Sequence, residues 1–147
     1  MENYGDVAKG FFKDVLSTYD LVFIGINTHR FALVGHQFAI SIFISLDGVT
    51  LDYLAPNADG TLDEFWVDTF ISKEFSEEDR MGIGNPKTIH ESIIAELKIS
   101  ANGLKNHWKS MLQGDKSWME SFMALGGTIR KASDYVVEVL APIFNQQ

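Results

Sequence analysis

Acidic side chains are the residues of this sequence whose number and spacing could support chemistry, either acid–base catalysis or the binding of a basic partner. Ten acids lie between Leu46 and Arg80, where the only bases are Lys73 and Arg80. This stretch carries a formal charge of −8, the same as the whole chain. Such a field repels phosphate backbones and attracts basic proteins. We therefore expect no nucleic-acid partner, and either a solvated acidic surface or a docking surface.

Seven of these acids are the candidate partner-binding residues, because they lie where the excess of negative charge is greatest. They are Asp59, Asp63, Glu64, Asp68, Glu77, Glu78 and Asp79. Neighbouring carboxylates such as Asp63 and Glu64 could also act as a general acid and a general base. That chemistry requires burial of one carboxyl group, which raises its pKa. Since these acids occur in polar stretches, the sequence favours solvation over catalysis.

Motifs for metal, phosphate and nucleophilic chemistry are incomplete. The chain has no cysteine, which excludes thiolate zinc sites, iron–sulfur clusters and disulfides. A calcium loop with Gly60 at its sixth position would place Trp66 where a bidentate glutamate is needed. A phosphate loop ending in Lys87-Thr88 would place Pro86 where a glycine is needed. No serine occupies a Gly-x-Ser-x-Gly elbow.

The histidines also lack a catalytic or metal-binding pattern. They are His29, His36, His90 and His107, and no pair has metal-ligand spacing. His36 could serve as a base near the predicted central strand, although a polar residue at a strand edge is the favoured interpretation. A basic–aromatic cluster consists of Lys105, His107, Trp108 and Lys109. We interpret it as a core tryptophan with a solvated rim, and a small RNA-binding patch is the alternative. We expect no metal, no cofactor and no enzymatic activity.

A β-hairpin is the clearest structural signal. Apolar residues alternate with small or mixed ones from Phe38 to Ser45, and the alternation resumes at Val49. Between the two runs, Asp47-Gly48 is typical of a tight turn with two positive-φ residues. The sequence therefore predicts an antiparallel hairpin of residues 37–46 and 49–54. Its first strand should be central, with at least one face covered by helix.

The remaining elements follow from periodicity and capping signals. Residues 7–19 have the spacing of an amphipathic helix, and residues 26–36 indicate a loop or an irregular strand. Residues 62–71 fit either a strand or a helix, and we favour the strand. Asn85-Pro86 predicts the start of a long helix. Further helices should follow, the last of them ending before Pro142.

Length and composition indicate a single domain. The chain has 147 residues, of which 46% are apolar, enough to bury a core without metal or disulfide. Met1–Asp6 does not resemble a secretory signal, and polar residues interrupt the apolar region Leu21–Leu46. We predict a cytoplasmic α+β domain over residues 1–147. It should have an N-terminal helix, a small antiparallel sheet containing the 37–54 hairpin, and C-terminal helices packed on it.

Three features together resemble the small cytoplasmic immunity proteins of bacterial polymorphic-toxin and contact-dependent inhibition systems. They are the short N-terminal helix, the hairpin Phe38–Leu54, and the run Leu112-Gln113-Gly114-Asp115-Lys116-Ser117-Trp118. The form Leu-x-Gly-Asp-x-x-Trp is similar to a run in several such families, where Gly-Asp joins two helices. The resemblance implies a non-enzymatic binder of one cognate toxin and assigns no contact residues.

Three functional hypotheses follow. The first is a stoichiometric inhibitor that neutralises a toxin through an acidic surface, with a nuclease as the candidate toxin. The alternative is a small-ligand-binding or enzymatic domain with an apolar pocket between helices and sheet. The third is an accessory or oligomer-forming protein. The first hypothesis implies a basic protein toxin as the partner, no membrane partner, and a monomer or weak dimer.

Overall fold

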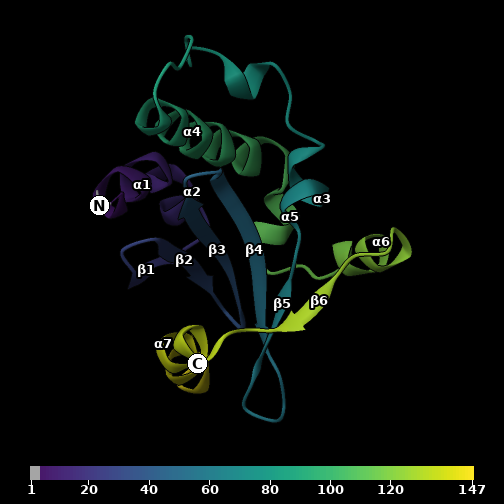
Figure 1. The fold of residues 1–147 in the computed structure, drawn as a ribbon. Helices are drawn as coiled ribbons and strands as arrows, with labels where there is room; N and C mark the ends of the chain where they lie inside the picture. Colours follow the sequence, from purple (N-terminus) through teal and green to yellow (C-terminus); the bar gives the residue numbers. More distant parts are fainter. Residues whose placement is uncertain (1–3) are drawn as a thin grey trace.

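The computed structural model describes residues 4–147 and shows one antiparallel sheet with helices on both faces (Figure 1). Each strand lies beside its neighbour in sequence. The strands are β1 (Val22–Asn27), β2 (Arg30–Gly35), β3 (Phe38–Ser45), β4 (Gly48–Pro56), β5 (Leu62–Phe65) and β6 (Ile129–Lys131). The predicted α+β class is confirmed. Residues 1–3, part of the stretch tested for a secretory signal, lie outside the described residues.

The helices precede, interrupt and follow the strands. They are α1 (Gly5–Phe11), α2 (Lys13–Thr18), α3 (Asp68–Ser72), α4 (Ile89–His107), α5 (Lys109–Leu112), α6 (Trp118–Ala124) and α7 (Asp134–Asn145), with a 3₁₀ turn η1 (Glu78–Arg80). The predicted helix 7–19 is divided at Phe12, a fully buried residue that is the boundary between α1 and α2. Pro142 lies inside α7 and does not end it. No helix of residues 4–147 combines the length and apolar character needed to cross a membrane.

The predicted hairpin is confirmed in its strands and corrected in its turn. β3 and β4 pair antiparallel, and Ser45 is opposite Gly48. The two turn residues are therefore Leu46 and Asp47. Of residues 46–48, only Gly48 has a positive φ, at +123°, and it is the first residue of β4. A side chain at Gly48 would meet the carboxylate of Glu96 on α4, so the glycine also permits this close approach.

Two segments contain more regular structure than the sequence indicates. β2 occupies residues 30–35 with every residue buried, although residues 26–36 suggested a loop or an irregular strand. Residues 62–71 form both of the alternatives, first β5 and then α3. β6 was not predicted, because its three residues become a strand only by pairing with β5.

The sheet has a major face and a minor face, which differ in how they are covered. The major face packs against α1, α2, α4, α5 and α6 in a large core that contains Leu33, Ile40 and Tyr53. The minor face packs against α7 alone, through residues such as Val34, Leu54 and Val136. Figure 1 shows α4 and α7 at opposite sides of the sheet. Because successive side chains of a strand point to opposite faces of the sheet, the same strands contribute residues to both faces.

The Leu-x-Gly-Asp-x-x-Trp run joins α5 to α6. Gly114 has φ of +90° and follows the end of α5. Asp115 Oδ1 accepts a hydrogen bond of 2.9 Å from the backbone N of Ser117 at the start of α6. Trp118 is then buried edge-on against Tyr53, with ring centroids 4.7 Å apart. The run therefore aims an aromatic side chain into the major core.

The long helix α4 begins later than predicted. Thr88 is its N-cap, and Thr88 Oγ1 accepts a hydrogen bond of 3.0 Å from Glu91 N. The Glu91 carboxylate accepts one of 2.9 Å from Lys87 N, so the two side chains hold the first turn in place. Asn85 and Pro86 precede the helix and do not start it.

Replacement of the N-cap tests this assignment. Thr88→Ala should lower the free energy of unfolding by about 1 kcal/mol, because Glu91 N loses its acceptor. Asn85→Ala is the matched control and should change it by less than about 0.5 kcal/mol. Urea denaturation followed by circular dichroism measures both. A larger loss for Asn85→Ala would contradict the observed helix start.

Candidate functional site

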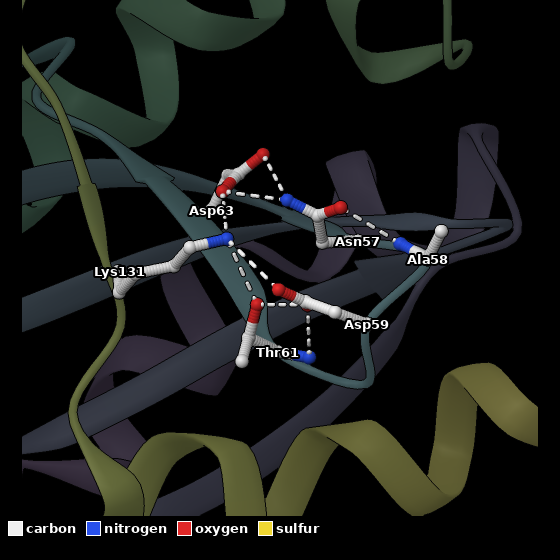
Figure 2. A network of polar contacts seen from close by, with 6 residues as sticks. All are labelled: Asn57, Ala58, Asp59, Thr61, Asp63 and Lys131. Atoms are coloured by element: carbon white, nitrogen blue, oxygen red, sulfur yellow. Dashed lines mark hydrogen bonds and ion pairs between the residues drawn. The ribbon is translucent and has the colours of Figure 1, made fainter.

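Asp59 and Asp63, two of the predicted partner-binding acids, surround a lysine of β6 (Figure 2). Lys131 Nζ lies 3.1 Å from Asp63 Oδ1 and 3.7 Å from Asp59 Oδ2. Asp63 also accepts hydrogen bonds of 3.2 Å from Asn57 Nδ2. Asp59 accepts bonds from the hydroxyl and the backbone N of Thr61. These contacts fasten the β4–β5 loop to β6.

Asp79 is fully buried and serves an internal role. Its carboxylate accepts hydrogen bonds from Ser76 N at 2.8 Å and Asn106 Nδ2 at 2.6 Å, and it contacts His107 Nε2 at 2.8 Å. Burial alone would raise the pKa of Asp79, but these hydrogen bonds outweigh it and hold the pKa below its usual value. The expectation that Asp79 belongs to a docking surface is therefore wrong, whereas Glu77 and Glu78 beside it are exposed.

The predicted acids do not form one continuous surface. The loop that carries Asp59 and the η1 segment that carries Glu78 lie at opposite ends of the molecule (Figure 1). Glu64 and Asp68 lie in neither place and instead line a cavity on the minor face. Acids that are close in sequence are therefore divided among three places: the β4–β5 loop, the η1 segment and a cavity.

Arg30 of β2 is the centre of a polar network on the minor face. Only 5% of its surface is exposed. Its Nε donates to Ser41 Oγ at 2.6 Å and its Nη1 to Tyr135 Oη at 3.1 Å. Its Nη2 contacts Asp52 Oδ2 at 3.3 Å and Glu64 Oε2 at 3.1 Å. The partners come from β3, β4, β5 and α7, so the network depends on the register of four strands and the position of a helix.

Asp52 is the most strongly perturbed carboxylate of this network. Burial and the neighbouring carboxylates of Glu64 and Asp68 together raise its pKa to about 6, against the opposing effect of Arg30. Asp68 follows the end of β5 and lies beside a part of β4 with which β5 does not pair. Its Oδ1 accepts a hydrogen bond of 2.8 Å from Leu51 N. Burial raises the pKa of Asp68 as well, partly offset by that bond.

These side chains line a cavity of about 540 Å³, which we call the Arg30 groove. It is lined by Arg30, Phe43, Thr50, Asp52, Glu64, Trp66, Asp68, Thr69, Thr128 and Tyr135. Trp66 is 47% exposed and Tyr135 is 39% exposed, so the polar floor has an aromatic rim. A cavity of about 310 Å³ adjoins it and shares Trp66, Thr69 and Thr128. The rest of its lining is Phe70 of α3, Lys73 just after α3, Phe122 of α6 and residues 125–127, which follow α6.

Sequence reasoning missed most of this groove. It noted Arg30 only as an interruption of an apolar region, and it did not single out Tyr135. A signal was present in the hairpin, where Ser41 and Asp52 interrupt otherwise apolar strands and are directly opposite each other. Two inward polar residues at paired positions indicate a buried polar cluster, which requires a partner charge.

The other sequence candidates do not form a site. His36 is exposed at the turn between β2 and β3. It does not line the Arg30 groove, and no carboxylate among the described residues forms a hydrogen bond with it. Trp108 is half-buried and donates from Nε1 to Ile71 O at 3.1 Å, while Lys105 contacts Asp14 at 3.3 Å on the surface. Among residues 4–147, no three histidines or acids are arranged to hold a metal ion. Comparison of the chain with protein-family models, curated proteins and solved structures gives no match.

Removal of the buried cation should destabilise the fold. Arg30→Ala leaves Asp52 and Glu64 buried without a counter-charge, so we expect a loss of about 3–5 kcal/mol in the free energy of unfolding near neutral pH. The matched control is Arg130→Ala, because that exposed guanidinium lies over the Trp66 ring at 4.8 Å. The control should lose about 1 kcal/mol or less. Equal losses in urea denaturation would contradict a central role for Arg30.

The raised pKa of Asp52 makes stability depend on pH. Its folded pKa of about 6 exceeds the usual value of 3.8, so its contribution is complete below the unfolded pKa and is lost as pH rises through the folded one. In the Asp52→Asn variant, the asparagine side chain at this position does not titrate. The wild type should therefore lose stability relative to this variant between about pH 4 and 7, by on the order of 1–3 kcal/mol. A constant difference across that range would contradict the shift.

Proposed function

We propose that the chain is a stoichiometric protein inhibitor, an immunity protein that neutralises a cognate toxin. The observation that carries the proposal is the Arg30 groove, in which buried charges are surrounded by exposed aromatic side chains. Trp, Tyr and Arg dominate the energetics of protein interfaces, especially beside desolvated charges. Trp66 and Tyr135 have this position at the groove.

An apolar area adjoins the groove and extends the candidate docking surface. Trp66 separates the groove from the adjoining cavity, where Leu125 is 67% exposed beside Phe70 and Phe122. We call the two cavities together the Trp66 surface. Exposed apolar area rimmed by polar residues is typical of a protein-docking site. A specific interface would bury about 1,200–2,000 Å² in total.

The charge of the chain favours a basic partner. Residues 1–80 carry fourteen acids against five bases, and Asp52, Glu64 and Asp68 of this half line the groove. A nuclease toxin must have a basic active site to bind phosphates, so an acidic inhibitor can occupy that site by charge complementarity. A nuclease is therefore the toxin class that the charge favours.

Close packing between α4 and the centre of the sheet favours this function over a small-ligand domain. That alternative requires an apolar pocket on the major face. There, Leu33 and Tyr53 of the sheet and Leu97 and Leu104 of α4 have no exposed surface. The Arg30 groove is instead on the minor face and is lined by charged residues. The Arg30 groove therefore combines buried charges with an exposed aromatic rim, which suits a protein partner.

To test the proposal, a toxin is sought in the reading frames next to the gene of this chain, and the purified toxin is titrated with the chain. Toxin activity should fall linearly and reach zero at one inhibitor per toxin. Trp66→Ala should weaken binding by at least about 30-fold, because truncation of a central aromatic residue typically costs 2 kcal/mol or more. The matched control is Met81→Ala, which removes an exposed apolar side chain near η1, remote from the groove. Its affinity should change by less than about 3-fold.

Two outcomes would contradict the proposal. One is the absence of any complex at micromolar concentrations of both proteins. The other is inactivation of toxin by far less than one equivalent of the chain, which would indicate turnover. Circular dichroism of Trp66→Ala would show whether weaker binding reflects a damaged fold.

A further inference from the structure

We propose that the Arg30 groove binds the guanidinium group of an arginine that the partner presents. The inference rests on the proposed function only in naming a protein as the source of that arginine. Its basis is the balance of charge in the groove and two carboxylate oxygens that lack hydrogen-bond donors.

The groove contains more negative charge than it neutralises. The carboxylates of Asp52, Glu64 and Asp68 line it, and Arg30 is the only cation among its lining residues. The nearby guanidinium of Arg130 lies over the Trp66 ring and is not part of the lining. Confined like charges without a counter-charge are costly, so a second cation in the groove would be stabilising.

The hydrogen bonds show where that cation would bind. Both oxygens of Glu64 are occupied, Oε1 by Trp66 Nε1 at 2.9 Å and Oε2 by Arg30. Asp52 accepts one bond, at Oδ2 from Arg30, and Asp68 accepts one, at Oδ1 from Leu51 N. Within residues 4–147, Asp52 Oδ1 and Asp68 Oδ2 receive no donor. Since Asp52 is only 8% exposed, water from the bulk can reach its carboxylate only through the groove.

An arginine matches these acceptors better than a lysine or a metal ion. A guanidinium carries five donors in a planar fork and can bond two carboxylates at once, whereas an ammonium is a compact, strongly hydrated charge. The rings of Phe43 and Tyr135 already have the Arg30 guanidinium 6.0 Å from their centroids, and the Trp66 ring has that of Arg130 at 4.8 Å. A second guanidinium would therefore stack on the opposite faces of these rim residues. The described acids are not grouped as metal ligands. The cavity is open at the surface, so the side chain can enter while its backbone stays outside.

A small arginine probe tests the site without the toxin. N-acetyl-arginine amide is titrated into the ¹⁵N-labelled chain, and the indole N–H resonance of Trp66 is followed by NMR. We expect saturable shifts with a Kd in the millimolar range, about what a ligand of this size can reach. N-acetyl-lysine amide should bind more weakly, and the neutral citrulline analogue should give no saturable shift. Absence of saturation with the arginine probe, or equal shifts with citrulline, would overturn the proposal.

A paired substitution at Thr50 separates charge from bulk. Thr50 lines the groove and is exposed, and its side chain makes no hydrogen bond within the described residues. Thr50→Lys should weaken binding of the arginine probe by about 10-fold or more, because it places a cation beside the carboxylates. Thr50→Gln has similar length and no charge, and should keep the affinity within about 3-fold. Equal weakening by both variants would overturn the charge-based site.

The probe and the toxin assay fail independently. Saturable binding of arginine supports this proposal even if no toxin is inhibited, in which case only the proposed function fails. Stoichiometric inhibition without any binding of the arginine probe overturns this proposal and leaves the inhibitor function standing.

Discussion

Burial of the Arg30 guanidinium is the constraint on which the minor face depends. A cation with 5% exposure must find hydrogen-bond acceptors and counter-charge inside the protein. It finds them in Ser41, Asp52 and Glu64 of three successive strands and in Tyr135 of α7. A shift of one residue in any of these strands would turn the partner to the other face. The register of β2–β5 and the groove above it are therefore linked.

The acidity of the chain has several structural roles, and only one of them concerns an open cavity. Asp63 holds the β4–β5 loop to Lys131, and Asp79 joins the segment before α4 to the end of that helix. Asp52 and Asp68 line the groove, and within residues 4–147 each has one carboxylate oxygen that receives no donor. Net charge alone indicates a basic partner, whereas the position of each carboxylate indicates where that partner would bind. The proposed inhibitor would use this local excess more than a general negative field.

Local patterns predicted the fold well and the site poorly. The hairpin was predictable because alternation and a turn lie within eighteen consecutive residues, 37–54. β6 was not, because three residues with no periodic pattern become a strand only beside β5, more than sixty residues earlier. Arg30 within an apolar region gains meaning only when its cross-strand neighbours are known. The start of α4 was misplaced because Asn85-Pro86 and Thr88-Glu91 are both capping signals, and the second pair forms the bonds.

The order of elements along the chain has a consequence for biosynthesis. The strands β1 to β5 emerge from the ribosome in succession and can pair as each hairpin is completed. The edge strand β6 and the covering helix α7 come later in the chain, from residues 129–145. Until they are released, Leu54 and Leu62 of the minor face are uncovered and Arg30 lacks its contact with Tyr135. A nascent chain therefore exposes an apolar sheet face, and the groove is complete only once α7 has packed against that face.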